Sequence, residues 1–255
     1  MKHHSMFHAF LFNNVHLITI IMRNTIFETT LIFVFSAMLM LAIAGTATAQ
    51  DTTNFRFKGF GLAMGIYQPE LDYWKTDTAS PFRNSDFSTT LFVEGFAEFR
   101  LLKDLTVKAG IGFWQARAET TIPTYGKTQL LLNGYPISLD LRYYASPLQV
   151  AFITPYVGVG GELVLINYQL DFADKDDPDP SNGSSILGSA TIGLELKLSR
   201  NFTFDLFADY KLGDYEQAFL VVTNPGPDQP SSADEITRDI SLSGPRLGIS
   251  LKYLF

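Results

Sequence analysis

In the last stretch of the chain, Ser241 to Phe255, apolar and mostly polar side chains alternate from Leu247 onward. Every second residue from 247 onward is apolar: Leu247, Ile249, Leu251, Tyr253 and Phe255. Successive side chains of a β-strand point to opposite sides, so this stretch predicts a strand with one apolar face and one polar face. Such a strand fits two structures that differ in which face is buried, a soluble sandwich and a barrel in a membrane.

The same alternation occurs in seven earlier runs, which makes a single all-β domain the expected fold. The eight runs are Phe55–Tyr67, Ser88–Leu101, Leu105–Arg117, Leu132–Tyr144, Ile153–Phe172, Ile186–Ser199, Phe202–Tyr215 and Ser241–Phe255. In the fifth run the pattern changes after Leu165, where polar residues take the apolar face. That change predicts either a β-bulge or a strand that has left the apolar layer.

The connections between the runs alternate between short and long. Residues 102–104 and 200–201 form two short turns, and residues 145–152 form a moderate one. The other four connections are long and polar: Gln68–Phe87, Ala118–Leu131, Ala173–Ser185 and Glu216–Ile240. This rhythm is typical of an eight-stranded antiparallel up-and-down transmembrane β-barrel.

The face opposite the apolar residues carries both signs of charge in equal number. Its acidic residues are Glu94, Glu98, Asp140, Glu162, Glu195, Asp205 and Asp209, and its basic residues are Arg100, Lys108, Arg142, Lys197, Lys211, Arg246 and Lys252. On a soluble sandwich this face would be solvated. In a barrel the balance of signs favours an enclosed lumen, because buried charges are tolerated when they are paired. The expected partner of Glu195 is Lys197, Lys211 or Arg100.

The first 49 residues have the features of a secretory signal peptide. The apolar run Leu31–Ala44 follows a basic start, and Ala47 and Ala49 give a small-residue cleavage site after Ala49. Met22 opens a better signal than Met1, so residues 1–21 are interpreted as an over-extended start, and residues 50–255 as the mature domain. The alternative is an N-terminal membrane anchor, although the run is shorter than the roughly 20 residues that a spanning helix needs.

The mature part has few resources for catalysis. It holds 17 Lys/Arg and 25 Asp/Glu residues, a net charge of −8, and neither His nor Cys. A Ser-His site is therefore excluded, and the acidic balance argues against nucleic acid. Glu94 and Glu98, like Asp205 and Asp209, would share a face, but at roughly 13 Å apart they are too distant for a carboxylate pair. We expect no enzyme and no cofactor.

The acidic stretch Asp171–Gly183 is the best candidate for a metal site. Its alternating carboxylates are Asp174, Asp176, Asp177 and Asp179. Hard cations prefer such oxygen ligands, but the spacing does not match an EF-hand, and two prolines favour a solvated loop. In the last long connection, the apolar stretch Phe219–Val222 is expected to extend a hairpin or to contact a ligand.

With the signal peptide, the eight runs, the strand opening Pro155–Glu162 and the ending Lys-Tyr-Leu-Phe, the chain resembles the small outer-membrane barrels of the OmpA, OmpX and OmpW type. The resemblance covers Phe55–Phe255 and implies a monomer in the bacterial outer membrane, in contact with lipid and lipopolysaccharide. It implies that Leu251, Tyr253 and Phe255 form the C-terminal signal for the barrel-assembly machinery. It also leaves two functions open. One is a structural or surface-interaction role with a lumen closed by paired charges, and the other is transport of small solutes or hydrophobic compounds.

Overall fold

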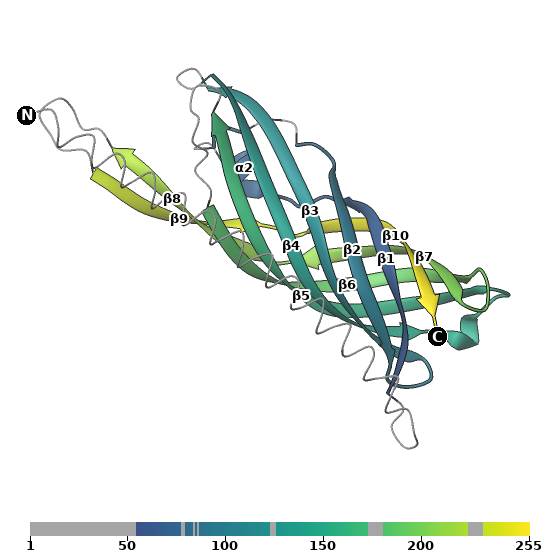
Figure 1. The fold of residues 1–255 in the computed structure, drawn as a ribbon. Coiled ribbons are helices and arrows are strands. Elements are labelled where there is room, and N and C mark those ends of the chain that lie inside the picture. The colour runs from purple at the N-terminus through teal and green to yellow at the C-terminus, as the bar shows by residue number, and fades with distance from the viewer. Residues whose placement is uncertain are drawn as a thin grey trace, which may run out of the picture. The chain divides into compact units, whose positions relative to one another are not determined.

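The computed structural model describes residues 55–223 and 232–255, apart from 78–79, 84, 86, 123–125 and 173–180. The expected signal peptide lies outside the described residues. Eight strands form a closed antiparallel barrel in the order β1-β10-β7-β6-β5-β4-β3-β2 (Figure 1). They are β1 (Arg56–Tyr67), β2 (Thr90–Arg100), β3 (Leu105–Ile122), β4 (Gly126–Tyr144), β5 (Ile153–Phe172), β6 (Ser181–Lys197), β7 (Phe202–Leu212) and β10 (Gly244–Leu254).

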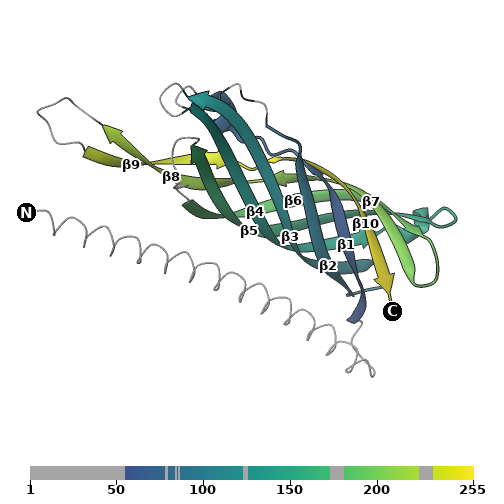
Figure 2. The ribbon, with the colours of Figure 1, turned by 45° about the horizontal axis from the view of Figure 1, so that its top comes forward.

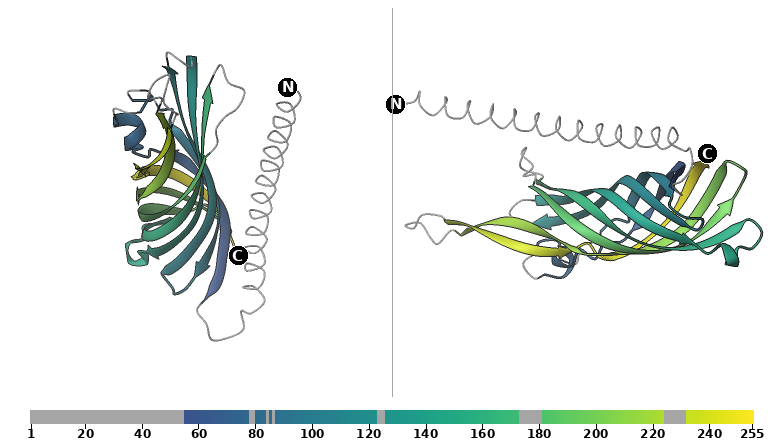
Figure 3. Two further views of the ribbon diagram at one scale, coloured as in Figure 1. Left: turned by 90° about the vertical axis from the view of Figure 1, so that its left-hand side faces the viewer. Right: turned by 90° about the horizontal axis from the view of Figure 1, so that it is seen from below.

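The strands run obliquely through the barrel wall (Figure 3), and the pairing register gives the size of the stagger. One row of paired residues, followed once around the barrel, starts at Ile192 of β6 and returns to β6 at Asn182. The members of this row are Ile192, Ala208, Leu247, Ile66, Leu91, Gln115, Asn133, Asn167 and Asn182. The row climbs ten residues in one circuit. Closure of eight tilted strands requires such a shear.

The outer surface of the barrel is apolar and exposed. Leu62 is 64% exposed, Val159 61% and Ile192 64%, although each is a residue that a soluble fold would bury. The polar residues of the same strands point inward. This arrangement is the inverse of a soluble sandwich, so the soluble alternative is wrong. Among the described residues, no helix is both long and apolar enough to cross a membrane.

The end of the barrel that holds the short turns is here named the short-turn end. The opposite, long-loop end differs from the sequence-based expectation. Strands β3 and β4 continue to Ile122 and from Gly126, so the predicted loop Ala118–Leu131 is mostly strand. Two further strands, β8 (Asp214–Thr223) and β9 (Ser232–Ser241), pair as a hairpin that continues from β7 and β10 (Figures 1 and 2). Of the two roles expected for Phe219–Val222, extension of a hairpin is confirmed for the backbone.

The connection between β1 and β2 folds against the long-loop end. It contains α2 (Asp72–Thr76), whose Trp74 is buried. The ring of Trp74 stacks on Tyr168 of β5 at 5.4 Å between centroids and meets Phe82 edge-on at 5.9 Å. Backbone amides of Glu70 and Leu71 donate to Ser243 and Ser241 across the gap to β9 and β10.

The interior of the long-loop end is an apolar core, which we call the cap core. Its members are Leu71, Trp74, Phe82, Ala116, Ala118, Leu130, Leu132, Val164, Ile166, Tyr168, Leu187, Tyr215, Ile240 and Leu242. The strands pass from the part of the barrel nearer the short-turn end into this region without a change of register. In β5 the pairing with β4 is continuous from Tyr156 to Phe172, so the pattern change after Leu165 is not a bulge. The strand instead leaves the apolar layer, with Ile166 and Tyr168 facing the cap core and Asn167 and Gln169 facing out.

Candidate functional site

Between the cap core and the short-turn end, the lumen holds an ion-pair network of seven carboxylates and six bases. All of these residues except Lys58 face inward because they alternate with the outward apolar positions of their strands. The network contains Lys58, Glu94, Glu98, Lys108, Asp140, Arg142, Glu162, Glu195, Asp205, Asp209, Lys211, Arg246 and Lys252. Apart from Lys58 and Glu195, which are partly buried, all of them are buried.

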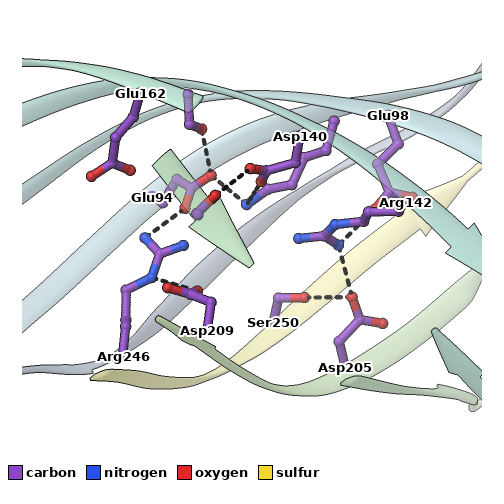
Figure 4. Close-up of polar contacts among 12 residues, drawn as sticks. Glu94, Glu98, Asp140, Arg142, Glu162, Asp205, Asp209, Arg246 and Ser250 are labelled. Carbon is purple, nitrogen blue, oxygen red and sulfur yellow. Dashed lines mark hydrogen bonds and ion pairs between the residues drawn. The ribbon is translucent and has the colours of Figure 1, made fainter. Parts of the chain in front are cut away.

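The part of the network nearer the cap core is centred on Arg246. Its guanidinium reaches Asp209 at 2.8 Å and Glu94 at 3.3 Å (Figure 4). Lys108 pairs with Glu94 as well, and Lys211 donates to Glu162 at 2.8 Å. The guanidinium of Arg246 also lies 4.6 Å from the ring of Phe92, which adds a cation–π contact. Each charged group therefore has at least one opposite charge in reach.

The part nearer the short-turn end is centred on Glu98. Arg142 reaches its carboxylate at 3.2 Å, Lys58 at 3.1 Å and Lys252 at 3.4 Å. Arg142 and Lys252 also reach Asp205 at 3.7 and 3.2 Å, as Figure 4 shows for Arg142. The charges of this cluster pair across β1, β2, β4, β7 and β10, so the cluster ties these five strands together.

Lys58 is the member that the alternation pattern could not supply. By the alternation of the neighbouring residues, Lys58 would lie on the outward face together with Phe60. A register shift between Phe57 and Gly59 in the pairing with β2 makes Lys58 the extra residue of a β-bulge. A bulge re-aims a side chain, and here it places the ammonium 3.1 Å from Glu98 and 3.3 Å from Glu195. A lysine among lipid-facing positions is the signal in the sequence that could have revealed it.

Two of the expected lumen residues do not belong to the network. Arg100 and Lys197 have inward parity, but they lie at strand ends and are exposed. The expectation for these two is wrong because parity fixes only the face of a strand and not the depth within the barrel. For the same reason the partners expected for Glu195 are wrong, since Lys252 and Lys58 pair with it.

Inward glycines let side chains from neighbouring strands lie flat against the wall. A Cβ on Gly248 would come within 2.6 Å of the Phe207 ring and 2.8 Å of the Phe92 ring. Rings over strand glycines are a known device for strengthening a curved sheet. The rings and the charges leave little space. The cavity beside Glu94, Glu162 and Arg246 measures about 10 Å³, which is the volume needed for one water.

Burial shifts the pKa of ionisable residues in and beside the cap core. Burial raises the pKa of the Tyr215 phenol above its usual value, and the pKa of the half-buried Tyr73 is raised for the same reason. Burial lowers the pKa of Lys75, whose ammonium donates to the Pro69 carbonyl at 2.8 Å and lies over the Phe87 ring. The segment that contains α2 is therefore packed into the barrel end as part of its core.

The other expected site residues are placed as follows. Leu251, Tyr253 and Phe255 lie on the outer face at the short-turn end, where Tyr253 contacts the rings of Phe60 and Phe202. Glu94 and Glu98 bind different bases and do not form a carboxylate pair. The four metal candidates Asp174, Asp176, Asp177 and Asp179 lie outside the described residues. Within the described part of the chain, no group of three or more His, Asp or Glu residues could hold a metal ion.

Comparison with known proteins identifies the fold. No family model and no curated protein matches the chain. Among solved structures, the outer-membrane protein OprG from Pseudomonas aeruginosa is 14% identical, with a TM-score of 0.50 over 80% of this chain and 96% of that one. A major outer membrane protein from Thermus thermophilus is 12% identical, with a TM-score of 0.48 over 78% and 99%. The outer membrane protein AlkL is 18% identical, with a TM-score of 0.44 over 80% and 91%.

These identities show the fold alone. Together with the closed barrel and its exposed apolar surface, the likeness to OprG confirms the expected architecture, a small eight-stranded transmembrane barrel of the outer-membrane type.

Proposed function

We propose that this protein is an integral outer-membrane barrel with a closed lumen. Its long-loop end and the α2 segment packed against it, here named the cap, would lie on the cell surface and serve a structural or surface-interaction role. The proposal is supported by two groups of buried side chains that face the interior. The ion-pair network lies in the lumen between the cap core and the short-turn end, and the cap core occupies the long-loop end. An eight-stranded barrel has room only for side chains or one small ligand, and here side chains take that room.

The remaining features are proposed in line with this function. Residues 1–49 would direct export and be removed after Ala49. The C-terminal strand, ending in Tyr253 and Phe255, would be read by the barrel-assembly machinery. The mature barrel would be a monomer without enzymatic activity, with its long-loop end outside the cell and the short-turn end in the periplasm.

Planar-bilayer conductance of the refolded mature chain tests the closed lumen. We expect no steady conductance from the wild type. A double variant with Glu94→Ala and Arg246→Ala removes two network side chains and supplies a positive control for an opened path. Steady, solute-dependent openings of the wild type would overturn the proposal.

The second candidate, transport of small hydrophobic compounds, is favoured by one observation. The interior of the long-loop end is lined with apolar side chains such as Leu130, Leu132 and Ile166, so displacement of the α2 segment would expose an apolar chamber. Wild-type liposomes that accumulate a hydrophobic dye faster than protein-free liposomes would favour this candidate over the closed barrel.

A further inference from the structure

Four side-chain amides form a continuous row on the outer face of β3, β4, β5 and β6. Gln115 pairs in register with Asn133, Asn133 with Asn167, and Asn167 with Asn182. The amide of Gln115 donates to Asn133 at 2.7 Å, and that of Asn167 donates to Asn182 at 2.8 Å. We call these four residues the amide row.

The amide row begins where the apolar outer surface ends. One step nearer the short-turn end, Phe113 and Tyr135 form an aromatic pair with centroids 5.4 Å apart. Aromatic residues mark the membrane–water interface of barrels. Strands of such barrels are tilted by about 35–45°, so a row perpendicular to the strands rises at a similar angle from the interface. With strands about 4.8 Å apart, the row is roughly 14 Å long.

Each amide keeps donors and acceptors free for a ligand. A primary amide has two N–H donors and an acceptor oxygen with two lone pairs, and the bonds within the row use one site of each residue. These bonds hold the amides in two pairs, Gln115 with Asn133 and Asn167 with Asn182, and the strand register places the two pairs side by side. A row of this kind can exchange hydrogen bonds with neighbouring hydroxyl groups, which are donors and acceptors themselves.

On the long-loop side of the row, the charges of the described residues are balanced, which favours a sugar over a phosphate as the ligand. Glu119 pairs with Arg117 and with Lys127, at 2.5 and 2.8 Å. Asp171 accepts a bond from Gln169 at 2.9 Å. Among the residues that the structure describes there, two bases and two acids leave no surplus of positive charge for a phosphate, which is bound best by clustered arginine or lysine. The uncharged amides therefore dominate recognition.

From this arrangement, we propose that the amide row binds the sugar part of the glycolipid in the outer leaflet, which is lipopolysaccharide. The lipid chains would lie against the apolar surface below Phe113 and Tyr135, and the sugars would follow the inclined row outward. This inference rests on the proposed outer-membrane location and assigns a specific site to the lipopolysaccharide contact that the resemblance implies.

The test is a titration of the refolded mature chain in detergent micelles with rough lipopolysaccharide, and in parallel with phosphatidylglycerol. The variant Asn133→Leu/Asn167→Leu removes the two central amides and keeps the face compatible with lipid. The matched control Gln149→Leu removes an exposed amide from the turn at the opposite end of the barrel. Heat-modifiable migration reports whether each variant is folded.

We expect the wild type and Gln149→Leu to bind lipopolysaccharide equally and in preference to phosphatidylglycerol. The double variant should bind it about tenfold more weakly, the loss expected for two neutral hydrogen-bonding side chains. If the leucine pair fails to fold, Asn133→Ser/Asn167→Ser replaces it and should weaken binding in the same direction.

Equal binding by the double variant, or equal binding of both lipids by the wild type, would overturn the inference. In that case a barrel that still inserts into bilayers and stays closed leaves the proposed function intact. A wild type that inserts into no bilayer would instead contradict the proposed function.

Discussion

Arg246 and Asp209 face each other directly in the pairing of β10 with β7, and their side chains are joined by a bond of 2.8 Å between Nε and Oδ2. Both side chains are buried in the lumen. The other arm of Arg246 reaches Glu94 on β2. A single arginine thus links strands across the lumen and neutralises carboxylates that would otherwise be buried without a partner.

The first prediction is that Arg246→Met destabilises the barrel by roughly 3–5 kcal/mol, because it leaves Asp209 and Glu94 short of a cation, with a smaller loss if water enters. Urea unfolding in lipid vesicles measures the change. Arg100→Met is the matched control, since Arg100 is exposed at a strand end and should change stability by about 0.5 kcal/mol or less. Equal effects of the two substitutions would mean that the network contributes nothing to stability.

How much of this arrangement follows from the sequence depends on the property considered. Alternation assigns each residue to a face, and eleven buried charges and Glu195 lie in the lumen as that pattern predicts. Alternation gives no depth, so it assigns Arg100 and Lys197 to the lumen although they lie at its rim. It also fails where a bulge intervenes, which is why it misses Lys58.

The cap core shows a second limit of the pattern. Polar outward residues such as Gln129 and Asn167 give their segments the sequence pattern of a loop, or of a strand whose apolar face has changed sides. The strands continue there, with polar side chains on the outer side and an apolar core on the inner side. The packing partner of that inner face, Trp74, comes from a distant connection, and no local pattern predicts such a long-range contact.

The second prediction concerns the close approach of strands at Gly65. A Cβ at this position would collide with the backbone carbonyl of Leu247 and lie 2.6 Å from the Cα of Gly248. Backbone cannot move aside as a side-chain end can, so Gly65→Ala should cost about 1–3 kcal/mol. Gly95→Ala is the control on the neighbouring strand, because the nearest atom there is a Leu62 methyl at 3.8 Å. Thermal unfolding of both variants in the same detergent compares them, and a tolerated Gly65→Ala would contradict the close approach.

The third prediction is that Trp74→Ala opens the cap without unfolding the barrel. Removal of the ring deletes its contacts with Tyr168 and Phe82, which should weaken local packing by about 3–5 kcal/mol. Trypsin reports the opening, because Lys75 and Arg83 are cleavage sites in this connection. We expect cleavage roughly two to four orders of magnitude faster than in the wild type, if opening and closing are fast relative to cleavage.

The control for the cap is Phe113→Ala, which removes an aromatic ring from the exposed outer surface and should leave the rate of trypsin cleavage unchanged. Cleavage of Trp74→Ala at the wild-type rate would show that the α2 segment is held by other contacts. Loss of heat-modifiable migration would show that the cap and the barrel unfold together.

The fourth prediction separates assembly from stability. Phe255 is 70% exposed, and its ring contacts Phe57 and Phe60 at 5.3 and 5.9 Å. Deletion of Phe255 should therefore change unfolding in detergent by about 1 kcal/mol or less. In cells it should lower the level of folded barrel in the outer membrane while secretion continues. Cell fractionation followed by heat-modifiability analysis measures this level, and an unchanged amount would argue against a C-terminal insertion signal.

The last prediction sets the two faces of β6 against each other. Leu194 points outward and is 42% exposed, whereas the side chain of Glu195 points inward and is bound by Lys252 and Lys58. Leu194→Arg puts a charge on the lipid-facing surface, at a cost of roughly 2–4 kcal/mol near the bilayer midplane. Glu195→Gln leaves the buried ammonium of Lys252 and the partly buried ammonium of Lys58 without one of their carboxylates, which should cost roughly 1–3 kcal/mol.

The medium in which unfolding is measured, lipid vesicles or detergent, distinguishes the two effects. The penalty of Leu194→Arg requires a bilayer and should shrink in short-chain detergent, because water reaches the outer surface of a small micelle more easily. The penalty of Glu195→Gln arises inside the barrel and should persist in both media, since neither lipid nor detergent enters the lumen. Urea unfolding of both variants in vesicles and in detergent gives the four values. A silent Glu195→Gln together with a harmless Leu194→Arg in vesicles would mean that the outward and inward faces of β6 are exchanged.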